Sequence, residues 1–104
     1  MAFVKVASLA ALPDGGVLGV EAGGKAICLV RVGDTVYAFA NNCTHRDFPL
    51  SEGEVDPEDC SITCEWHGAR FDIRDGRALS LPATRPVHTY RCRVEGPDIL
   101  VDVD

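Results

Sequence analysis

The hydrophobic and polar positions in the first part of the chain alternate in the way typical of β-strands. Phe3–Val6 predicts a first strand and Val17–Glu21 a second, with a turn or a single helical turn over Ser8–Gly16. Glycine and proline are scattered between these short apolar runs, and this pattern favours β-structure over long helices.

A hairpin is the clearest element that the pattern predicts. Lys25–Val32 and Thr35–Phe39 are rich in β-branched and aromatic residues, and they flank the two-residue turn signal Gly33-Asp34. Regular strand patterns return near the end of the chain, over Thr89–Val94 and Ile99–Val103. We therefore expect both ends of the chain to build one β-scaffold.

The regular pattern fails in the middle third, from Asn41 to Pro82. Short strands are predicted there only at Ser61–Thr63 and Arg70–Ile73, with a turn at Asp75-Gly76. The sequence thus predicts one all-β domain over residues 1–104, interrupted by a loop-rich segment at approximately 41–83. Loops held on a rigid scaffold are where functional residues usually concentrate.

Size and charge exclude several classes of protein. A chain of 104 residues and 11.2 kDa forms one small domain, and its 46% hydrophobic residues suffice for a core. Ten basic residues against 16 acidic ones give a formal charge of −6, which argues against nucleic acid and anionic membranes as partners. We see no signal sequence and no long apolar run, so we expect a soluble, cytoplasmic protein.

The cysteines point to metal binding. An odd number at irregular spacing cannot form a complete disulfide framework, and a reducing compartment would disfavour one. Thiolates are ligands for zinc and for iron, so metal ligation is the leading explanation. The five cysteines are Cys28, Cys43, Cys60, Cys64 and Cys92.

Two short motifs in the middle third each combine one cysteine with one histidine. They are Cys43-Thr44-His45 and Cys64-Glu65-Trp66-His67. A structural zinc site normally uses paired CxxC or HxxxH motifs, whereas this mixed pairing fits a two-iron cluster better. A zinc site and four buried residues without any metal remain alternatives at this point.

The residues around these motifs closely resemble the cluster-binding segments of Rieske-type [2Fe–2S] ferredoxins. The resemblance is carried by Cys43–Gly53, by Cys64–Asp72 and by the downstream Leu81-Pro82-Ala83, and it extends from about Ala38 to the C-terminus. It implies a small all-β sandwich or barrel with an inserted cluster-binding subdomain. Glu65 is a departure, because the family commonly has proline there.

The resemblance also implies one Rieske-type [2Fe–2S] cluster and its ligands. Cys43 and Cys64 would bind the buried iron, and His45 and His67 the outer one. No residue is expected to be catalytic.

The reduction potential should be low for a Rieske centre. Rieske proteins of high potential have an extra disulfide and hydroxyl groups that donate to the cluster, and such donors stabilise its reduced state. We therefore expect a potential on the order of −150 mV. The matching positions in this chain are apolar: Phe48, Trp66, Ala69 and Phe71.

The small size and the low expected potential resemble those of ferredoxin components of bacterial aromatic-ring dioxygenases. Such a protein is not itself an enzyme: it carries one electron from a flavin-dependent reductase to a terminal oxygenase. The excess of carboxylates suggests that the oxygenase has a basic docking surface. Two alternatives are the small subunit of an assimilatory nitrite reductase and a zinc-stabilised interaction module.

Other residues that could bind metal have simpler explanations. Cys28 and Cys92 lie in strand-like runs and are expected to be small buried hydrophobic residues. Cys60 is expected at a loop edge, and His88 is expected to be an ordinary strand residue. A solvated acidic loop is predicted from Glu52, Glu54, Asp56, Glu58 and Asp59.

Overall fold

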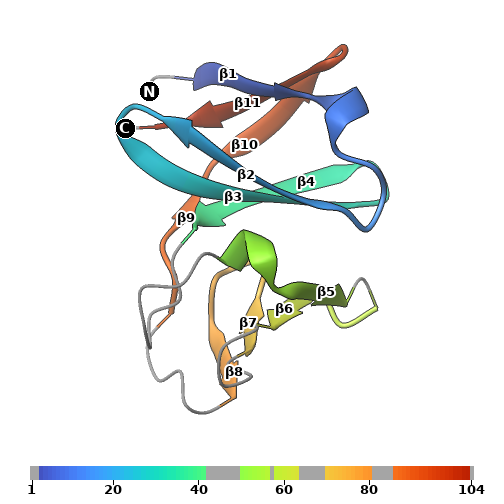
Figure 1. Cartoon of the computed structure of the whole chain (residues 1–104), viewed down its shortest axis with the longest axis vertical. Helices are drawn as coiled ribbons and strands as arrows, with labels where there is room; N and C mark the ends of the chain where they lie inside the picture. The colour runs from blue at the N-terminus through green and yellow to red at the C-terminus, as the bar shows by residue number, and fades with distance from the viewer. Residues whose placement is uncertain (1–2, 42–49, 57, 64–69, 81–85, 104) are drawn as a thin grey trace.

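The computed structural model describes residues 3–41, 50–56, 58–63, 70–80 and 86–103, and this part of the chain confirms the all-β prediction. Figure 1 shows two regions stacked along the long axis: a basal region of β1–β4 and β9–β11, and below it a small sheet of β5–β8. No helix in the described ranges is long and apolar enough to cross a membrane. The elements are β1 (Phe3–Ser8), the 3-10 helix η1 (Leu9–Ala11), β2 (Val17–Ala22), β3 (Lys25–Val32), β4 (Thr35–Ala40), the 3-10 helix η2 (Leu50–Glu52), β5 (Glu54–Asp56), β6 (Ser61–Thr63), β7 (Arg70–Asp72), β8 (Ala78–Ser80), β9 (Thr89–Tyr90), β10 (Cys92–Glu95) and β11 (Asp98–Asp102).

The basal region consists of two antiparallel sheets. One has the strand order β1-β11-β10 and the other β2-β3-β4-β9. The predicted hairpin is confirmed: Val32 pairs with Thr35, and Gly33 turns the chain with a φ of 63°, a conformation that glycine adopts without strain.

The predicted continuous strand Thr89–Val94 is wrong, because the chain changes sheets in its middle. β9 pairs with β4, whereas β10 pairs with β11 in the other sheet. Arg91 lies at the change, and its carbonyl accepts a hydrogen bond from the backbone N–H of Asp102. The alternating sequence pattern continues through this corner, so it could not show where the strand breaks.

Strand β3 separates two hydrophobic cores. Its four central residues, Ile27 to Val30, are all completely buried. Because successive side chains of a strand point to opposite faces, Ile27 and Leu29 enter one core with Ile99 and Val101 of β11. Cys28 and Val30 enter the other core, which basal residues share with the small sheet.

The small sheet has the order β5-β6-β7-β8, with every neighbouring pair antiparallel. The predicted strand at Ser61–Thr63 is confirmed and the one at Arg70–Ile73 ends at Asp72, but the prediction of only two strands was wrong. A row of paired residues across the sheet packs against the shared core. This row is Val55, Ile62, Phe71 and Ala78.

Candidate metal centre

The four predicted cluster ligands lie outside the described residues. Cys43 and His45 belong to residues 42–49, which we call the first ligand segment, and Cys64 and His67 belong to residues 64–69, the second ligand segment. Leu81-Pro82-Ala83 also lies outside them. The structure therefore describes the residues from which these segments start and to which they return.

These starting points are aligned across the small sheet. Glu54 pairs with Thr63, Thr63 with Arg70, and Arg70 with Ser80, so four strands contribute one row. The second ligand segment joins Thr63 to Arg70, and residues 81–85 follow directly after Ser80. Because the strands are antiparallel, the second ligand segment and residues 81–85 begin at the same end of the sheet, which we call the ligand end. The first ligand segment returns to this end through η2, which precedes β5.

Hydrogen bonds fix the two ends of the first ligand segment to each other. The Nδ2 amide of Asn41 donates to Oγ of Ser51 over 3.0 Å, and the backbone N–H of Ser51 donates to Oδ1 of Asn41 over 2.8 Å. The backbone N–H of Asn41 donates to the carbonyl of Ala26 on the basal region. Leu50 is completely buried in the shared core, which anchors the returning chain.

Gly53 lets the chain that leaves the first ligand segment pass close to the strand that enters the second ligand segment. The backbone of Gly53 lies so close to the carbonyl of Thr63 that a Cβ atom at this position would overlap with it. Thr63 is the residue immediately before Cys64. Glycine therefore allows the chain that leaves one ligand segment to contact the chain that enters the other.

The buried carboxylate of Asp72 stabilises the turn at the opposite end of the small sheet. The Asp72 side chain is only 3% exposed and accepts hydrogen bonds from Nε and Nη2 of Arg74, at 3.0 and 2.8 Å. Oδ1 of Asp72 also accepts the backbone N–H of Arg74. The Arg74 side chain holds the pKa of the Asp72 carboxyl below its usual range, mainly through these hydrogen bonds. This pair fixes the turn between β7 and β8, away from the ligand end.

The described cysteines and the described histidine do not form a metal site. Cys28 is completely buried, as predicted, and burial raises the pKa of its thiol. Cys92 is only partly buried, less than predicted, and burial raises its pKa to about 11. Both groups are thus thiols at neutral pH, the form that binds metal poorly. Cys60 lies in the turn before β6, and His88 is exposed just before β9 rather than within a strand. Within the described ranges, no three His, Cys, Asp or Glu side chains are grouped to hold a metal ion.

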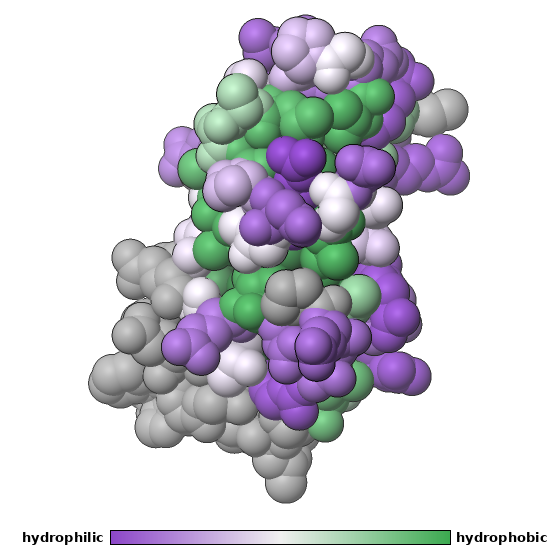
Figure 2. Space-filling model, turned by 90° about the vertical axis from the view of Figure 1, so that its right-hand side faces the viewer, coloured by the Kyte–Doolittle hydropathy of each residue, from purple (hydrophilic) through white to green (hydrophobic). Residues whose placement is uncertain are grey.

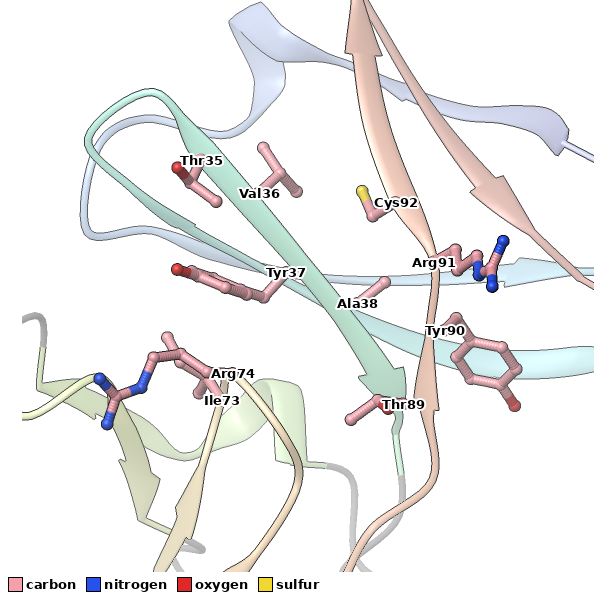
Figure 3. A pocket seen from close by; sticks show the side chains of 10 residues that line it. All are labelled: Thr35, Val36, Tyr37, Ala38, Ile73, Arg74, Thr89, Tyr90, Arg91 and Cys92. Atoms are coloured by element: carbon pink, nitrogen blue, oxygen red, sulfur yellow. The ribbon is translucent and has the colours of Figure 1, made fainter.

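An open cleft of about 460 Å³ lies elsewhere, between the basal region and the turn after β7 (Figure 3). Tyr37 on β4 and Cys92 on β10 line it from the basal side, and Ile73 and Arg74 line it from the small sheet. Ile73 and Arg74 directly follow β7, at the end of the sheet opposite the ligand end. The cleft is therefore distinct from the candidate metal centre.

The donor set and the alignment of its flanking residues fit a Rieske cluster. Two cysteines and two histidines are the ligands of such a cluster, in which histidines replace two cysteines on one iron. Each ligand segment supplies one residue of each kind; the second segment starts from the ligand end of the small sheet, and the first returns to that end through η2. The contacts of Asn41 with Ser51 and of Gly53 with Thr63 could not be predicted from the sequence, since no periodic pattern relates these residues.

Comparisons with known proteins agree with this fit over nearly the whole chain. The family described as "Rieske [2Fe-2S] domain" matches residues 2–91. The ferredoxin component of biphenyl 2,3-dioxygenase from Rhodococcus jostii is 38% identical over 104 residues, which cover 100% of this chain and 95% of that protein.

Two solved structures show the same fold in close relatives. The ferredoxin of carbazole 1,9a-dioxygenase from Nocardioides aromaticivorans superposes with a TM-score of 0.93 and 38% identity, covering 97% of both chains. A ferredoxin chain in a complex of reduced oxygenase and oxidized ferredoxin in carbazole 1,9a-dioxygenase gives a TM-score of 0.87 and 32% identity, covering 95% of this chain and 91% of that one.

Proposed function

Because the chain belongs to the family of Rieske [2Fe–2S] domains, we propose that it is the ferredoxin component of an aromatic-ring dioxygenase system. The observation that carries this proposal is similarity over the full length to proteins that are themselves ferredoxin components. In this role the chain is an electron carrier, and the oxidation of the aromatic substrate takes place on the oxygenase.

The proposal assigns the cluster ligands to Cys43, His45, Cys64 and His67. The two thiolates would hold one iron and the two imidazoles the other, so that each ligand segment contributes to both irons. When bound, the cluster accepts and releases one electron at a time. The alignment of the flanking residues at the ligand end supports this assignment.

The described residues would act as a fixed frame for this cluster. The small sheet aligns the start of the second ligand segment with the strand that follows the first one, and Leu50 ties the frame to the shared core. The boundaries proposed for the cluster-binding subdomain, approximately residues 41–83 of a single domain 1–104, enclose β5–β8 and both ligand segments.

A low reduction potential is part of the proposal. Phe71 is completely buried in the shared core and carries no hydroxyl group that could donate to a cluster sulfur. Fewer donors leave the reduced state less stabilised, so we expect a midpoint on the order of −150 mV. Redox titration of the purified protein tests this, and a midpoint above about +100 mV would contradict it.

The proposed partners are a terminal oxygenase with a basic docking surface and a flavin-dependent reductase. A related ferredoxin is present in a complex with an oxygenase, which supports the first partner. Charge supports the basic surface: residues 41–83 carry nine carboxylates against four arginines, whereas the rest of the chain carries seven against six. Attraction between opposite charges speeds the encounter of two proteins and orients them. We keep the cytoplasmic location predicted above as a proposal, which cell fractionation tests.

Reconstitution tests the function. Purified protein with its cluster, a flavin-dependent ferredoxin reductase and a ring-hydroxylating oxygenase are mixed with NADH and an aromatic substrate, and oxygenated product is measured. Product should form only when the ferredoxin is present, and a Cys43→Ser variant should give none. A stable complex with a sirohaem-containing subunit would favour the nitrite reductase alternative, and a colourless protein loaded with zinc would overturn both redox functions.

A further inference from the structure

Asn41 and Ser51 form a pair across the two ends of the first ligand segment. Nine residues separate them in the chain, and this stretch contains Cys43 and His45. The Asn41 side chain uses its oxygen and its nitrogen on the same partner, accepting the Ser51 N–H at 2.8 Å and donating to the Ser51 hydroxyl at 3.0 Å. Two hydrogen bonds between the same two residues fix orientation as well as distance.

Gly19 on β2 makes room for this pair. A Cβ atom at Gly19 would lie 2.8 Å from Oγ of Ser51 and 2.9 Å from Nδ2 of Asn41, closer than side-chain atoms normally approach. The φ of Gly19 is not in the left-handed region, so the backbone conformation does not require glycine there. Space for the pair is the physical reason that the structure provides for glycine at this position in a strand.

The basal region also fixes one partner of the pair directly. The Asn41 backbone donates to the Ala26 carbonyl at 3.0 Å, and the preceding Ala40 donates to the His88 carbonyl at 2.7 Å. Asn41 is thus attached to the rigid scaffold, and Ser51 is held in turn by the Asn41 side chain. The separation between the two ends of the first ligand segment follows from these contacts.

We propose that Asn41 and Ser51, seated on Gly19, are positioning residues that hold the two ends of the first ligand segment at a fixed separation and so slow the loss of the cluster. The inference rests on the proposed function, because it needs Cys43 and His45 to be ligands. Fixing the two ends of a loop lowers the number of conformations open to it, so ligands between fixed ends stay near the metal more of the time. Each hydrogen bond lost should change the equilibrium for separating Asn41 from Ser51 by about fivefold.

The test compares variants of the full chain with the cluster bound. Asn41→Ala removes both hydrogen bonds, Ser51→Ala removes one, and Asn41→Asp keeps the acceptor for the Ser51 N–H while its second oxygen accepts the Ser51 hydroxyl. Gly19→Ala places a methyl group against the pair, and Glu21→Ala at an exposed position of the same strand is its matched control. Val101→Ala on β11, in the other core, is a control for general destabilisation.

Three quantities are measured: the rate at which visible absorbance decays in excess iron chelator, the width of the EPR signal of the reduced protein, and the free energy of unfolding in urea. We expect Asn41→Ala to lose iron about 25-fold faster, Ser51→Ala about fivefold faster, Gly19→Ala a few fold faster, and Asn41→Asp at nearly the wild-type rate. The Asn41→Ala signal should broaden, because the ligand segment samples more conformations. Val101→Ala should lose stability while its EPR signal remains unchanged.

The inference is overturned if Asn41→Ala loses iron no faster than Val101→Ala at equal stability and keeps the wild-type EPR signal. If Asn41→Ala fails to fold, Ser51→Ala and Gly19→Ala decide by the same criterion. The ligand assignment is checked separately with Cys43→Ser. A Cys43→Ser protein that binds a complete cluster would refute the assignment and the inference together, whereas the first result refutes only the inference.

Discussion

The basal region and the small sheet are both antiparallel β-structure, but they are stabilised in different ways. Strands of the basal region reach eight residues, as in β3, whereas each strand of the small sheet has three. Strands this short are at the lower limit for globular proteins and need a hydrophobic partner to persist. The small sheet obtains one from the shared core, so the candidate metal centre depends on packing against the basal region.

The two regions also differ in charge. The small sheet and its flanking segments carry five of the six net negative charges, and Glu54, Asp56, Glu58 and Asp59 are all exposed there. In Figure 2, which views the molecule from the β5 side, hydrophilic side chains lie over both regions, with apolar surface showing between them. The comparison suggests a division of roles: the basal region provides stability, and the small sheet provides the ligand end and the charged surface.

The largest expected effect comes from removing a large side chain from the shared core. Phe71→Ala should lower the free energy of unfolding by about 3 to 4 kcal/mol, because the Phe71 ring is completely buried and its removal leaves a cavity. Ile99→Ala in the other core should cost about 3 kcal/mol for the same reason. Urea titrations followed by far-UV circular dichroism and by visible absorbance measure both losses.

The two cores should differ in what they protect. Phe71→Ala should lose its visible absorbance at a lower urea concentration than its far-UV signal, since the small sheet detaches before the basal region unfolds. In Ile99→Ala the two signals should change together. If the two signals coincide in Phe71→Ala as well, the small sheet and the basal region form one cooperative unit, and the division of roles is wrong.

A smaller effect is expected from the close approach of Gly53 to Thr63. Gly53→Ala should cost about 2 kcal/mol of unfolding free energy, because its Cβ would overlap with a backbone carbonyl and β5 would have to shift. Gly24→Ala in the basal region is a matched control: its φ is 75° and no atom lies within 4 Å of the added Cβ, so only the backbone strain of about 1 kcal/mol remains. Equal losses of unfolding free energy in the two variants would show that Gly53 and Thr63 are not in tight contact.

These examples show what the sequence could predict. The hairpin of β3 and β4 was predictable because long runs of β-branched residues on both sides of Gly33-Asp34 repeat one signal many times. β5 and β8 were missed because each places a single residue, Val55 or Ala78, against the core, which is too little for a pattern to show. A cysteine and a histidine two or three positions apart are a distinctive signal, so the sequence offers candidate ligands; the four residues lie outside the described ranges and their assignment stays a prediction.

The frame of the candidate site was not predictable for a different reason. A Cβ atom at position 53 would overlap with Thr63, and one at position 19 would approach Asn41 and Ser51 too closely. These residues meet only in the folded chain. The break at Arg91 likewise depends on which sheet each half of the strand joins. Long-range contacts of this kind leave no periodic signal in one sequence.

The pair of Asp72 and Arg74 should contribute a pH-dependent stability. Arg74 lowers the pKa of the Asp72 carboxyl in the folded state, so the pair stabilises the protein above the unfolded pKa of about 3.9, and this contribution is lost as the pH falls through the lower folded value. Asp72→Asn should therefore cost about 1 kcal/mol at pH 7, since Arg74 is half exposed and water screens the pair.

Below about pH 4 the stability of Asp72→Asn should approach that of the wild type. Urea unfolding of both proteins at several pH values measures the difference, and Asp98→Asn is a control on the exposed pair with Lys5 in the basal region. A difference between wild type and Asp72→Asn that stays constant down to pH 2 would contradict the role of the Asp72 charge.

The smallest expected effect concerns the charge difference between the two regions. Glu54→Gln removes one exposed carboxylate at the ligand end, and Glu21→Gln removes one from the basal strand β2. If the ligand end faces a basic surface of the oxygenase, Glu54→Gln should slow electron transfer to the oxygenase about twofold at low ionic strength, and Glu21→Gln should change it much less. Stopped-flow oxidation of the reduced ferredoxin by the oxygenase measures both rate constants, and the difference should vanish in about 0.5 M salt because the ions screen the attraction. Equal slowing by the two variants would mean that only the total charge matters, and the small sheet would then have no special part in docking.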